Sequence, residues 1–416
     1  MSLSRLIERV SSIIHRPPGG SSRTSASLLA STRESSAGVD HLDEASAAFA
    51  VRLHRRLRVV GDNLCASPFS IRAVLALVLA GARGGTAREL AELLAVGDQD
   101  AALALLQAET GESLQSDALR VAAAAWIDRS VRLLPDFEAS IQPLLVGGFQ
   151  VVDFGSGRAV GATINEWVRE RTAGRIDSIV DAVPADTRLM LVNAVAFAAK
   201  WESPLTVDEM RPRPFSSEDG RTSPLPFMSA EPHAPYARTA RYEAVDLAYR
   251  DLPYSLLLVL PPADGSLSAF EDTLTAAVLA DIVRHLEVQR VQVLLPRFTI
   301  ESTVIELPAV CAAEGCRSAF DRSAANLSGI NGLTPPAAEA LFVNEVRHRA
   351  RIEVDETGTT ATAATVAVIQ EAASPRHVPP PPPRFVADRP FLFVLRNRVT
   401  GSIIFMGRVA DPTPSS

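Results

Sequence analysis

Side chains able to do covalent chemistry are scattered along the chain and are not grouped as a catalyst would need. An enzyme requires a nucleophile with a positioned base, a pair of carboxylates or a metal cluster. The sequence has no Gly-x-Ser-x-Gly elbow, no His-Glu-x-x-His and no Gly-x-x-x-x-Gly-Lys loop, and its 7 histidines are far apart. We therefore expect no enzyme, no bound cofactor and no metal site.

The cysteines give the same indication. Cys65, Cys311 and Cys316 have no spacing typical of a zinc site or a disulfide framework. Each lies in apolar sequence, which predicts buried, unreactive thiols, whereas an exposed Cys311 or Cys316 would be reactive.

Composition limits the kind of partner. Of the 416 residues 47% are hydrophobic, which is enough for a large core, and the net charge of -7 argues against binding to nucleic acid or acidic membrane surfaces. No apolar run approaches the length of about 20 residues that a membrane-spanning helix needs. No part of the sequence is typical of a basic groove. Lys200 is the sole lysine among 41 basic residues, which indicates a compositional bias of the genome.

The segment Thr357–Ile369 has the composition of a strand but is followed by the sequence of a surface loop. It has no charge and no proline, and nearly all its residues are small or β-branched, which suits a strand buried on both faces. A turn-forming stretch and five prolines, Pro379–Pro383, come next and belong on a surface. By itself the segment is either a flexible linker or a strand that can be inserted into a sheet.

Alternation favours insertion. Every second residue of a strand faces the same side, and only one side of an inserted strand must fit a packed interior. The residues sharing that side are all small, so a sheet could accept them without overpacking. They are Thr359, Ala361, Ala363, Thr365 and Ala367.

The segment and its surroundings resemble the serpin family. The similarity covers about residues 40–412 in the family's order, and the combination of motifs is highly specific. The matching motifs are Asn63–Ile71 with Leu79–Thr86, Thr163–Val168 with Thr172–Ile176, Leu191–Ala194 with Phe197–Trp201, Leu294–Phe298, the stretch beginning at Glu356, and Phe385–Pro412.

The elements fit that resemblance. Helical spacing of apolar residues comes early in the chain and strand-like runs come late, which predicts an α+β fold. The resemblance implies about eight or nine helices, three β-sheets and an exposed reactive-centre loop at about 356–384. We expect helices at Ala45–Leu53, Ile71–Ala80 and Ala87–Leu94, and buried strands at Leu189–Ala198, Ser255–Leu260, Gln289–Ile300 and Phe391–Leu395.

By length the chain could be two domains, but the resemblance favours a single serpin domain over 39–416. Residues 1–38 differ from the rest: a short amphipathic pattern precedes Ser-, Gly- and Pro-rich sequence, and we expect a disordered or weakly helical extension. Arg5, Glu8 and Arg9 interrupt any signal-peptide core, although the family's role favours an extracellular location.

The resemblance implies a mechanism. Serpins are suicide inhibitors of serine proteases: the protease forms an acyl-enzyme with the loop, and the cleaved arm inserts into the main sheet before water can release the enzyme. The resemblance assigns the loop hinge to Glu356, Gly358, Thr359, Ala361, Ala363 and Thr365. Thr357 and Thr360 occupy positions where inhibitory members usually have acidic residues, but neither adds bulk.

A further set of residues matches polar and aromatic positions near the point where the sheet opens. The resemblance implies that the four polar residues form a hydrogen-bonded gate and that Trp201 covers the top of the opening. By position alone the four residues could equally be an ordinary buried polar cluster. The set is Ser67, Ser70, Asn193, Trp201 and His348.

The reactive bond has two candidates. Counting forward from Glu356 by the family's usual spacing places it between Ala372 and Ala373, whereas counting back from Phe385 gives the neighbourhood of Arg376 and His377. The loop is longer than usual, and the surplus fits the proline run, so we favour Ala372.

Each bond predicts a different partner. Cleavage after Ala372 fits an elastase-like or subtilisin-like serine protease, whereas cleavage after Arg376 fits a trypsin-like one. We expect a monomeric inhibitor from a bacterium; the alternative is a non-inhibitory serpin, with a carrier, chaperone or structural role, whose loop is merely cleaved.

Overall fold

A computed structural model describes residues 42–97, 100–101, 104, 118–141, 149–207, 211–359 and 380–413, all within the unit His41–Ser416. These residues form nine α-helices and three main sheets, which confirms the α+β prediction. The helices are α3 (Glu44–Leu57), α4 (Pro68–Gly81), α5 (Gly84–Leu94), α7 (Pro135–Ile141), α8 (Gly157–Arg171), α9 (Leu267–Thr273), α10 (Ala276–Arg284), α11 (Leu307–Ala313) and α12 (Ser328–Asn331).

The main sheet has the order β3-β2-β4-β17-β18-β5, and β15 and β16 also pair with β17. Its two central strands, β4 and β17, run parallel and pair directly over residues 190–196 and 345–351. We call this pairing the seam. The strands are β2 (Leu119–Asp128), β3 (Phe149–Val152), β4 (Leu189–Phe197), β5 (Ala199–Lys200), β15 (Phe298–Glu301), β16 (Ile305–Glu306), β17 (Glu345–Val354) and β18 (Gly358–Thr359).

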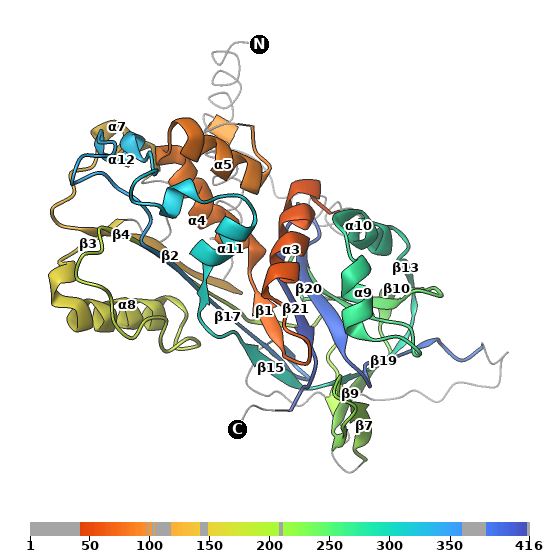
Figure 1. Cartoon of the computed structure of the whole chain (residues 1–416). Coiled ribbons are helices and arrows are strands. Elements are labelled where there is room, and N and C mark those ends of the chain that lie inside the picture. The colour runs from red at the N-terminus through yellow and green to blue at the C-terminus, as the bar shows by residue number, and fades with distance from the viewer. Residues whose placement is uncertain are drawn as a thin grey trace, which may run out of the picture. The chain divides into compact units, whose positions relative to one another are not determined.

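Burial of the central strands follows from their sequences. Every residue of β4 is buried, as expected for an apolar strand covered on both faces. In β17 the pattern alternates, with Val346, Ala350 and Ile352 buried and the charged residues between them partly exposed. Figure 1 shows α8 on one side of this sheet and α4 and α11 on the other.

The second sheet has the order β1-β21-β20-β12-β11-β10-β13, and α3, α9 and α10 pack on one of its faces (Figure 1). A third sheet has the order β19-β14-β9-β6, and β7 and β8 form a separate hairpin. The remaining strands are β1 (Leu64–Ala66), β6 (Thr206–Val207), β7 (Arg213–Ser216), β8 (Thr222–Leu225), β9 (Phe227–Ala230), β10 (His233–Arg238), β11 (Glu243–Ala248), β12 (Tyr254–Leu260), β13 (Glu287–Arg290), β14 (Gln292–Pro296), β19 (Arg384–Val386), β20 (Phe391–Asn397) and β21 (Ile403–Val409).

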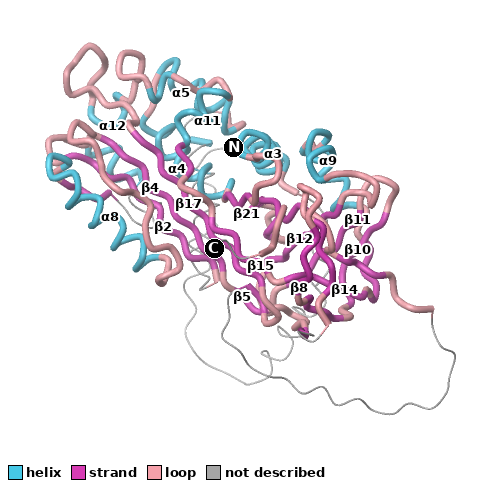
Figure 2. Tube along the Cα trace, turned by 60° about the horizontal axis from the view of Figure 1, so that its bottom comes forward, coloured by secondary structure: helices cyan, strands magenta, loops and turns pink. Residues whose placement is uncertain are grey.

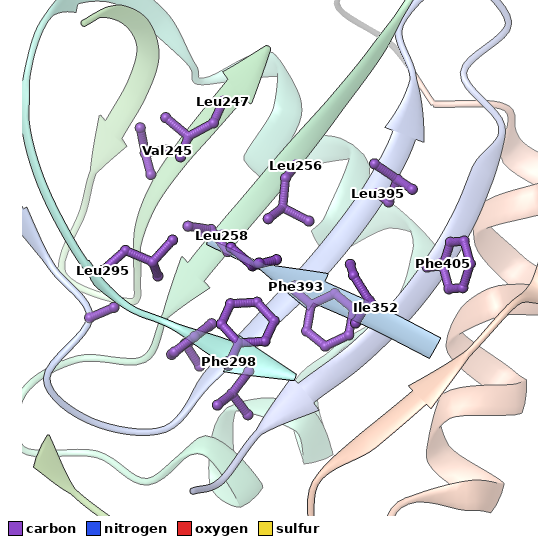
Figure 3. Close-up of a cluster of buried hydrophobic side chains, with 14 of the residues drawn as sticks. Val245, Leu247, Leu256, Leu258, Leu295, Phe298, Ile352, Phe393, Leu395 and Phe405 are labelled. Atoms are coloured by element: carbon purple, nitrogen blue, oxygen red, sulfur yellow. The ribbon is translucent and has the colours of Figure 1, made fainter. Parts of the chain in front are cut away.

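A hydrophobic cluster joins all three sheets. Ile352 and Phe298 from the main sheet pack with Phe393 and Leu258 from the second sheet and Leu295 from the third (Figure 3). Phe298 lies edge-on to Phe391 with ring centroids 5.7 Å apart, a favourable aromatic arrangement. The carboxyl-terminal half of β17 therefore packs on this cluster through its buried face. The charged side chains on the opposite face of the strand are partly exposed.

The expected helices and strands are present, with one correction. The prediction of a single buried strand over Gln289–Ile300 is wrong, because this run contributes β13, β14 and β15 to three different sheets. The apolar content that suggested one strand belongs mainly to β14, which is buried, whereas β13 is a largely exposed edge strand. Apolar content alone does not indicate where a chain leaves one sheet and enters another.

The three cysteines are free and buried, as predicted. Burial raises the pKa of Cys65 and of Cys311 well above the usual thiol range, and it raises the pKa of Cys316 to about 12. All three are therefore protonated and unreactive at neutral pH.

Candidate functional site

The first residues of the hinge already belong to the main sheet. Gly358 and Thr359 form β18, which pairs with the end of β17 at Val354 and with β5 at Ala199 and Lys200. On the side of β18 away from β5, β4 and β17 pair directly with each other along the seam. The hinge thus begins at the end of the seam next to β5, and β4 and β17 are paired with each other along the rest of the seam (Figure 2).

Gly358 is at this position because there is no space for a side chain. A Cβ atom added to Gly358 would lie 2.0 Å from the backbone oxygen of Ala199 and 2.6 Å from Cα of Lys200. Both are backbone atoms of β5, so neither can move without disturbing the strand. The close approach of two backbones is a property that only glycine allows here.

Thr359 is fully buried and has a polar partner beneath the sheet. Its Oγ1 lies 2.6 Å from the hydroxyl of Tyr249. The Tyr249 ring stacks on Trp201 with centroids 4.5 Å apart, and burial raises the pKa of Tyr249 well above its usual range. Tyr249 is therefore protonated and can hydrogen-bond the hydroxyl of Thr359.

A turn centred on Asp355 shapes the chain before β18. One carboxylate oxygen of Asp355 accepts hydrogen bonds from the backbone N–H of Thr357 at 2.8 Å and of Gly358 at 3.0 Å. The indole N–H of Trp201 donates to the backbone oxygen of Asp355 at 2.9 Å. The backbone N–H of Trp201 donates to Thr357 at 3.0 Å, so Trp201, only 1% exposed, holds the turn twice.

Glu356 forms a bidentate ion pair with Arg297. The two oxygen–nitrogen distances are 2.8 and 2.9 Å. Partial burial opposes ionisation of Glu356, but the hydrogen bonds and charge of Arg297 outweigh it and lower the pKa of the carboxyl group. The backbone oxygen of Glu356 also accepts from Leu205 at 2.9 Å, which ties the hinge to the loop after β5.

The polar residues of the set expected at the opening lie together across the seam. His348 on β17 is directly paired with Asn193 on β4, and its Nδ1 lies 2.9 Å from Asn193 Oδ1. Ser70 on α4 donates its hydroxyl to the same oxygen at 2.7 Å, and Asn193 donates its amide back to the Ser70 backbone oxygen at 2.8 Å. The backbone N–H of Ser67 donates to His348 Nε2 at 3.1 Å. All four residues are at most 1% exposed.

These contacts assign the tautomer of His348. Because Nε2 accepts from a backbone amide, the ring proton is on Nδ1 and is donated to Asn193. Burial lowers the pKa of His348 to about 3, so the ring is neutral at physiological pH. The hydroxyls, amide and imidazole cannot act as a nucleophile with its base, since every nitrogen of the ring is occupied and no substrate reaches it. They join α4, β4 and β17.

Trp201 is apart from this polar group. It lies beside β18, at the end of the seam next to β5, where it contacts Tyr249 and the turn at Asp355. The structure therefore separates the sheet-opening set into two sites along the same seam.

Several predicted site residues lie outside the described residues. These are the hinge positions Ala361, Ala363 and Thr365 and the reactive-bond candidates Ala372, Ala373, Arg376 and His377. The predicted extension 1–38 also lies outside them.

Three residues that hold the hinge were not singled out from the sequence. Arg297 lies inside the recognised motif Leu294–Phe298, and its charge opposite Glu356 was the available signal. Asp355 directly precedes the hinge, where an Asx turn is common before a glycine. Tyr249 gave no sequence signal, because nothing local relates it to a residue 110 positions further on.

Within the described part of the chain no group of three or more His, Cys, Asp or Glu side chains is placed to hold a metal ion. Among the same residues, no helix is long and apolar enough to cross a membrane.

Comparison with known proteins gives consistent matches. A family model described as Serpin (serine protease inhibitor) matches residues 44–412. An uncharacterised serpin-like protein of Thermococcus kodakarensis is 32% identical over 373 residues, which are 88% of this chain and 84% of the relative. The leukocyte elastase inhibitor of Bos taurus is 32% identical over 390 residues, which are 90% of this chain and 100% of the relative.

Solved structures share the fold. The native state of the thermophilic serpin tengpin matches with a TM-score of 0.79 and 24% identity, over 98% of both chains. Native protease nexin-1 with heparin matches with a TM-score of 0.76 and 27% identity, over 89% of this chain and 98% of the other.

Proposed function

The chain belongs to the serpin family, whose members are not enzymes, and we propose that it is a suicide inhibitor of a serine protease. One observation carries the proposal. The hinge residues Gly358 and Thr359 are paired at the end of the seam next to β5, and β4 and β17 are paired with each other along the rest of the seam. From this arrangement a cleaved arm could extend β18 along the seam, between β4 and β17.

The small side chains of the arm match the residues that they would face on β17. If the antiparallel pairing of Thr359 with Val354 continued, Ala361, Ala363 and Thr365 would come opposite Ile352, Ala350 and His348. The facing residues of β17 are all buried, so only small side chains could enter without overpacking. The alternation of threonine and alanine in the hinge meets this requirement.

In the proposed reaction the protease serine attacks the carbonyl carbon of the reactive bond. An ester to the enzyme forms, the peptide bond breaks, and the downstream segment leaves with a new amino terminus. The upstream arm then separates β4 from β17 and forms hydrogen bonds to both. Displacement of the bound protease from its working geometry prevents water from hydrolysing the ester.

Arm length favours the bond between Ala372 and Ala373. If the register of β18 with β5 and β17 continued, the arm would reach the far end of the seam near Ile369, opposite the start of β4 at Leu189. Cleavage after Ala372 leaves a short connection from there to the enzyme, whereas cleavage after Arg376 adds slack that would weaken the displacement. Ala372 suits an elastase-like or subtilisin-like protease, and the leukocyte elastase inhibitor among the relatives is consistent with this target class.

The test is incubation of the full chain with elastase, subtilisin and trypsin, followed by a denaturing gel and intact masses. We expect a covalent complex with elastase or subtilisin and a released fragment beginning at Ala373. A complex whose fragment begins at His377 would move the specificity to arginine. Cleavage by every protease without a complex would contradict the proposal and indicate a non-inhibitory serpin.

Thr359→Arg tests the hinge assignment. The Thr359 side chain is fully buried and lies against Tyr249, so an arginine cannot be seated there without leaving a buried, unpaired charge. We expect the variant to be cleaved without forming the covalent complex. Thr299→Arg, at an exposed position of β15, is the control and should inhibit normally. Full inhibition by Thr359→Arg would rule out this mapping of the hinge.

A further inference from the structure

Two of the three buried cysteines lie at the end of the same helix. Cys311 is in the last turn of α11, and Cys316 is the second residue after its C-cap residue, Glu314. Gly315, just before Cys316, has a φ of 93°, the left-handed conformation that commonly ends a helix. Both cysteines are buried in one hydrophobic cluster together with Val346 of β17.

The end of α11 is a Schellman motif. The backbone N–H of Cys316 donates to the backbone oxygen of Cys311 at 2.9 Å, and that of Gly315 donates to Ala312 at 3.2 Å. In this motif the side chains at the two ends of the longer hydrogen-bonded turn commonly contact each other. These two positions are occupied here by Cys311 and Cys316, so the motif brings the two thiols together.

The same hydrogen bond limits how far apart the two cysteines can lie. With standard bond lengths, a nitrogen–oxygen distance of 2.9 Å keeps the Cα atoms of Cys311 and Cys316 within about 6.8 Å of each other. A disulfide joins Cα atoms that are about 4.4–6.8 Å apart. The backbone therefore already has a separation that a disulfide can span. Cys65 belongs to a different hydrophobic cluster.

We propose that Cys311 and Cys316 are a redox modification site, at which a small disulfide such as oxidised glutathione converts the two thiols into a disulfide across the end of α11. The thiolate of one cysteine attacks the oxidant, which forms a mixed disulfide and releases one glutathione. The thiolate of the other cysteine then attacks the protein sulfur of the mixed disulfide, and the second glutathione leaves. The protein loses two electrons and two protons, and the oxidant gains them as two thiols.

Burial decides when this reaction occurs. Cys311 and Cys316 are at most 3% exposed, and burial raises the pKa of both thiols, with Cys316 adding to the effect on Cys311. Neither thiol attacks an oxidant while the turn is closed. Oxidation therefore takes place during folding or when the end of α11 opens. This helix has only 7 residues and no side-chain hydrogen bond at its N-cap, which favours such opening.

The disulfide would lie where three helices meet. Glu314, the C-cap residue of α11, forms an ion pair with Arg56 of α3. Two residues after Cys316, the backbone N–H of Ser318 donates to Glu89 of α5 at 2.9 Å. A covalent ring at this junction restricts the unfolded chain and so stabilises the folded one. The inference does not depend on the proposed function.

The test measures how strongly the folded chain favours the disulfide. The full chain is incubated at about pH 8 in buffers with a series of ratios of reduced to oxidised glutathione. A second sample enters the same buffers by refolding from urea, so that burial of the thiols cannot prevent the reaction. Acid quenching, alkylation in denaturant and intact masses then count the free thiols. The series is repeated in urea for the unfolded chain.

We expect one free thiol in oxidising buffers, and a tryptic peptide 298–317, which contains both cysteines, that is about 2 Da lighter than its reduced form. The folded chain should favour the disulfide at least about tenfold more than the unfolded chain, and by linkage the same factor measures how much the disulfide stabilises the fold. Cys65→Ser is the control and should show the same preference. Three free thiols in both folded samples at every ratio, a disulfide that includes Cys65, or an equal preference in the folded and unfolded chains would overturn the site.

Discussion

At the scale of single residues, the hinge depends on the small size of its side chains. Gly358 passes so close to β5 that no Cβ fits, and Thr359 is small enough to lie beneath the sheet against Tyr249. Thr359 is paired on two sides, with Val354 and with Ala199, and Gly358 is paired with Lys200. Small changes here should therefore have large effects on the position of the whole loop.

Gly358→Ala should expel β18 from the sheet. The new Cβ would collide with the backbone of Ala199, which cannot rotate away as a flexible side chain could. We expect the free energy of unfolding to fall by about 1–3 kcal/mol and protease trapping to slow. The measurements are urea unfolding and complex formation on gels. Gly85→Ala, where no atom lies within 4 Å of the added Cβ, is the control and should neither lower the free energy of unfolding nor slow trapping.

His348 should make stability depend on pH. Burial lowers its pKa to about 3 in the folded protein, against about 6.5 in the unfolded chain. Between these values the unfolded chain binds a proton and the native state does not, so its contribution is full above about pH 6.5 and is lost as pH falls towards 3. The loss at pH 5 is about 2 kcal/mol.

The comparison variant is His348→Gln, which keeps a donor for Asn193 and an acceptor for Ser67 but does not titrate. Urea unfolding at pH 7 and pH 5 should show a smaller change for this variant than for the parent. An identical change in both proteins would mean that His348 is not the titrating group.

A local motif gave a signal for some of the site residues. The backbone around Gly358 and Thr359, and the grouping of Asn193, His348 and two serines, follow positions quoted from the sequence. Tyr249 could not be foreseen, because its contact with Thr359 exists only after two sheets have packed together. The roles of these residues in insertion stay predictions.

At the scale of elements, β17 has two different faces. Its inner face supplies His348, Ala350 and Ile352 to the buried side of the seam, and its outer face carries Arg347, Arg349 and Arg351. The hinge begins at Glu356, two residues after the end of β17 at Val354, so any movement of β17 also moves the base of the loop. The ion pair of Glu356 with Arg297 joins that base to the connection between β14 and β15.

Arg297→Gln should loosen the hinge without unfolding the protein. The pair is 41% and 31% exposed, so its contribution is at most about 1 kcal/mol and the urea midpoint should shift little. The amides of Trp201 and Leu205, which donate to Thr357 and Glu356, should exchange hydrogen faster. Arg290→Gln removes a similarly exposed pair with Glu231 and is the control. Unchanged exchange at Trp201 and Leu205 would show that the backbone alone holds the hinge.

Elements with a single strong pattern were predictable, and those that depend on partners were not. The helix α4 and the strand β4 are mostly apolar and were predicted to within a few residues. The run from Gln289 to Ile300 was misread because a strand's length and burial are set by the neighbour it pairs with, and here three neighbours in three sheets divide it.

At the scale of the whole molecule, the proposed function requires a native state that is not the most stable one. The seam holds β4 and β17 together through seven residue pairs that an inserted strand would replace with two new sets of hydrogen bonds. The energy available for displacing a protease is the difference between these two arrangements. The family is established, while the target, the compartment and a bacterial source stay predictions.

Cleavage in the loop should therefore stabilise the chain. At about 1 kcal/mol for each net new hydrogen bond, a strand of about ten residues should raise the unfolding temperature by about 10 °C or more. Differential scanning calorimetry before and after nicking with subtilisin measures this directly. The Thr359→Arg variant, cleaved in the same way, should show a much smaller gain. No gain in the parent chain would indicate a loop that stays outside the sheet.

Lys200 offers a practical consequence of the same geometry. It is the sole lysine of the chain, its side chain is exposed, and its backbone is paired with Gly358. An amine-reactive fluorophore would consequently attach at one internal position, beside the hinge. Its emission would follow the movement of the loop in real time during an encounter with a protease, without any engineered cysteine.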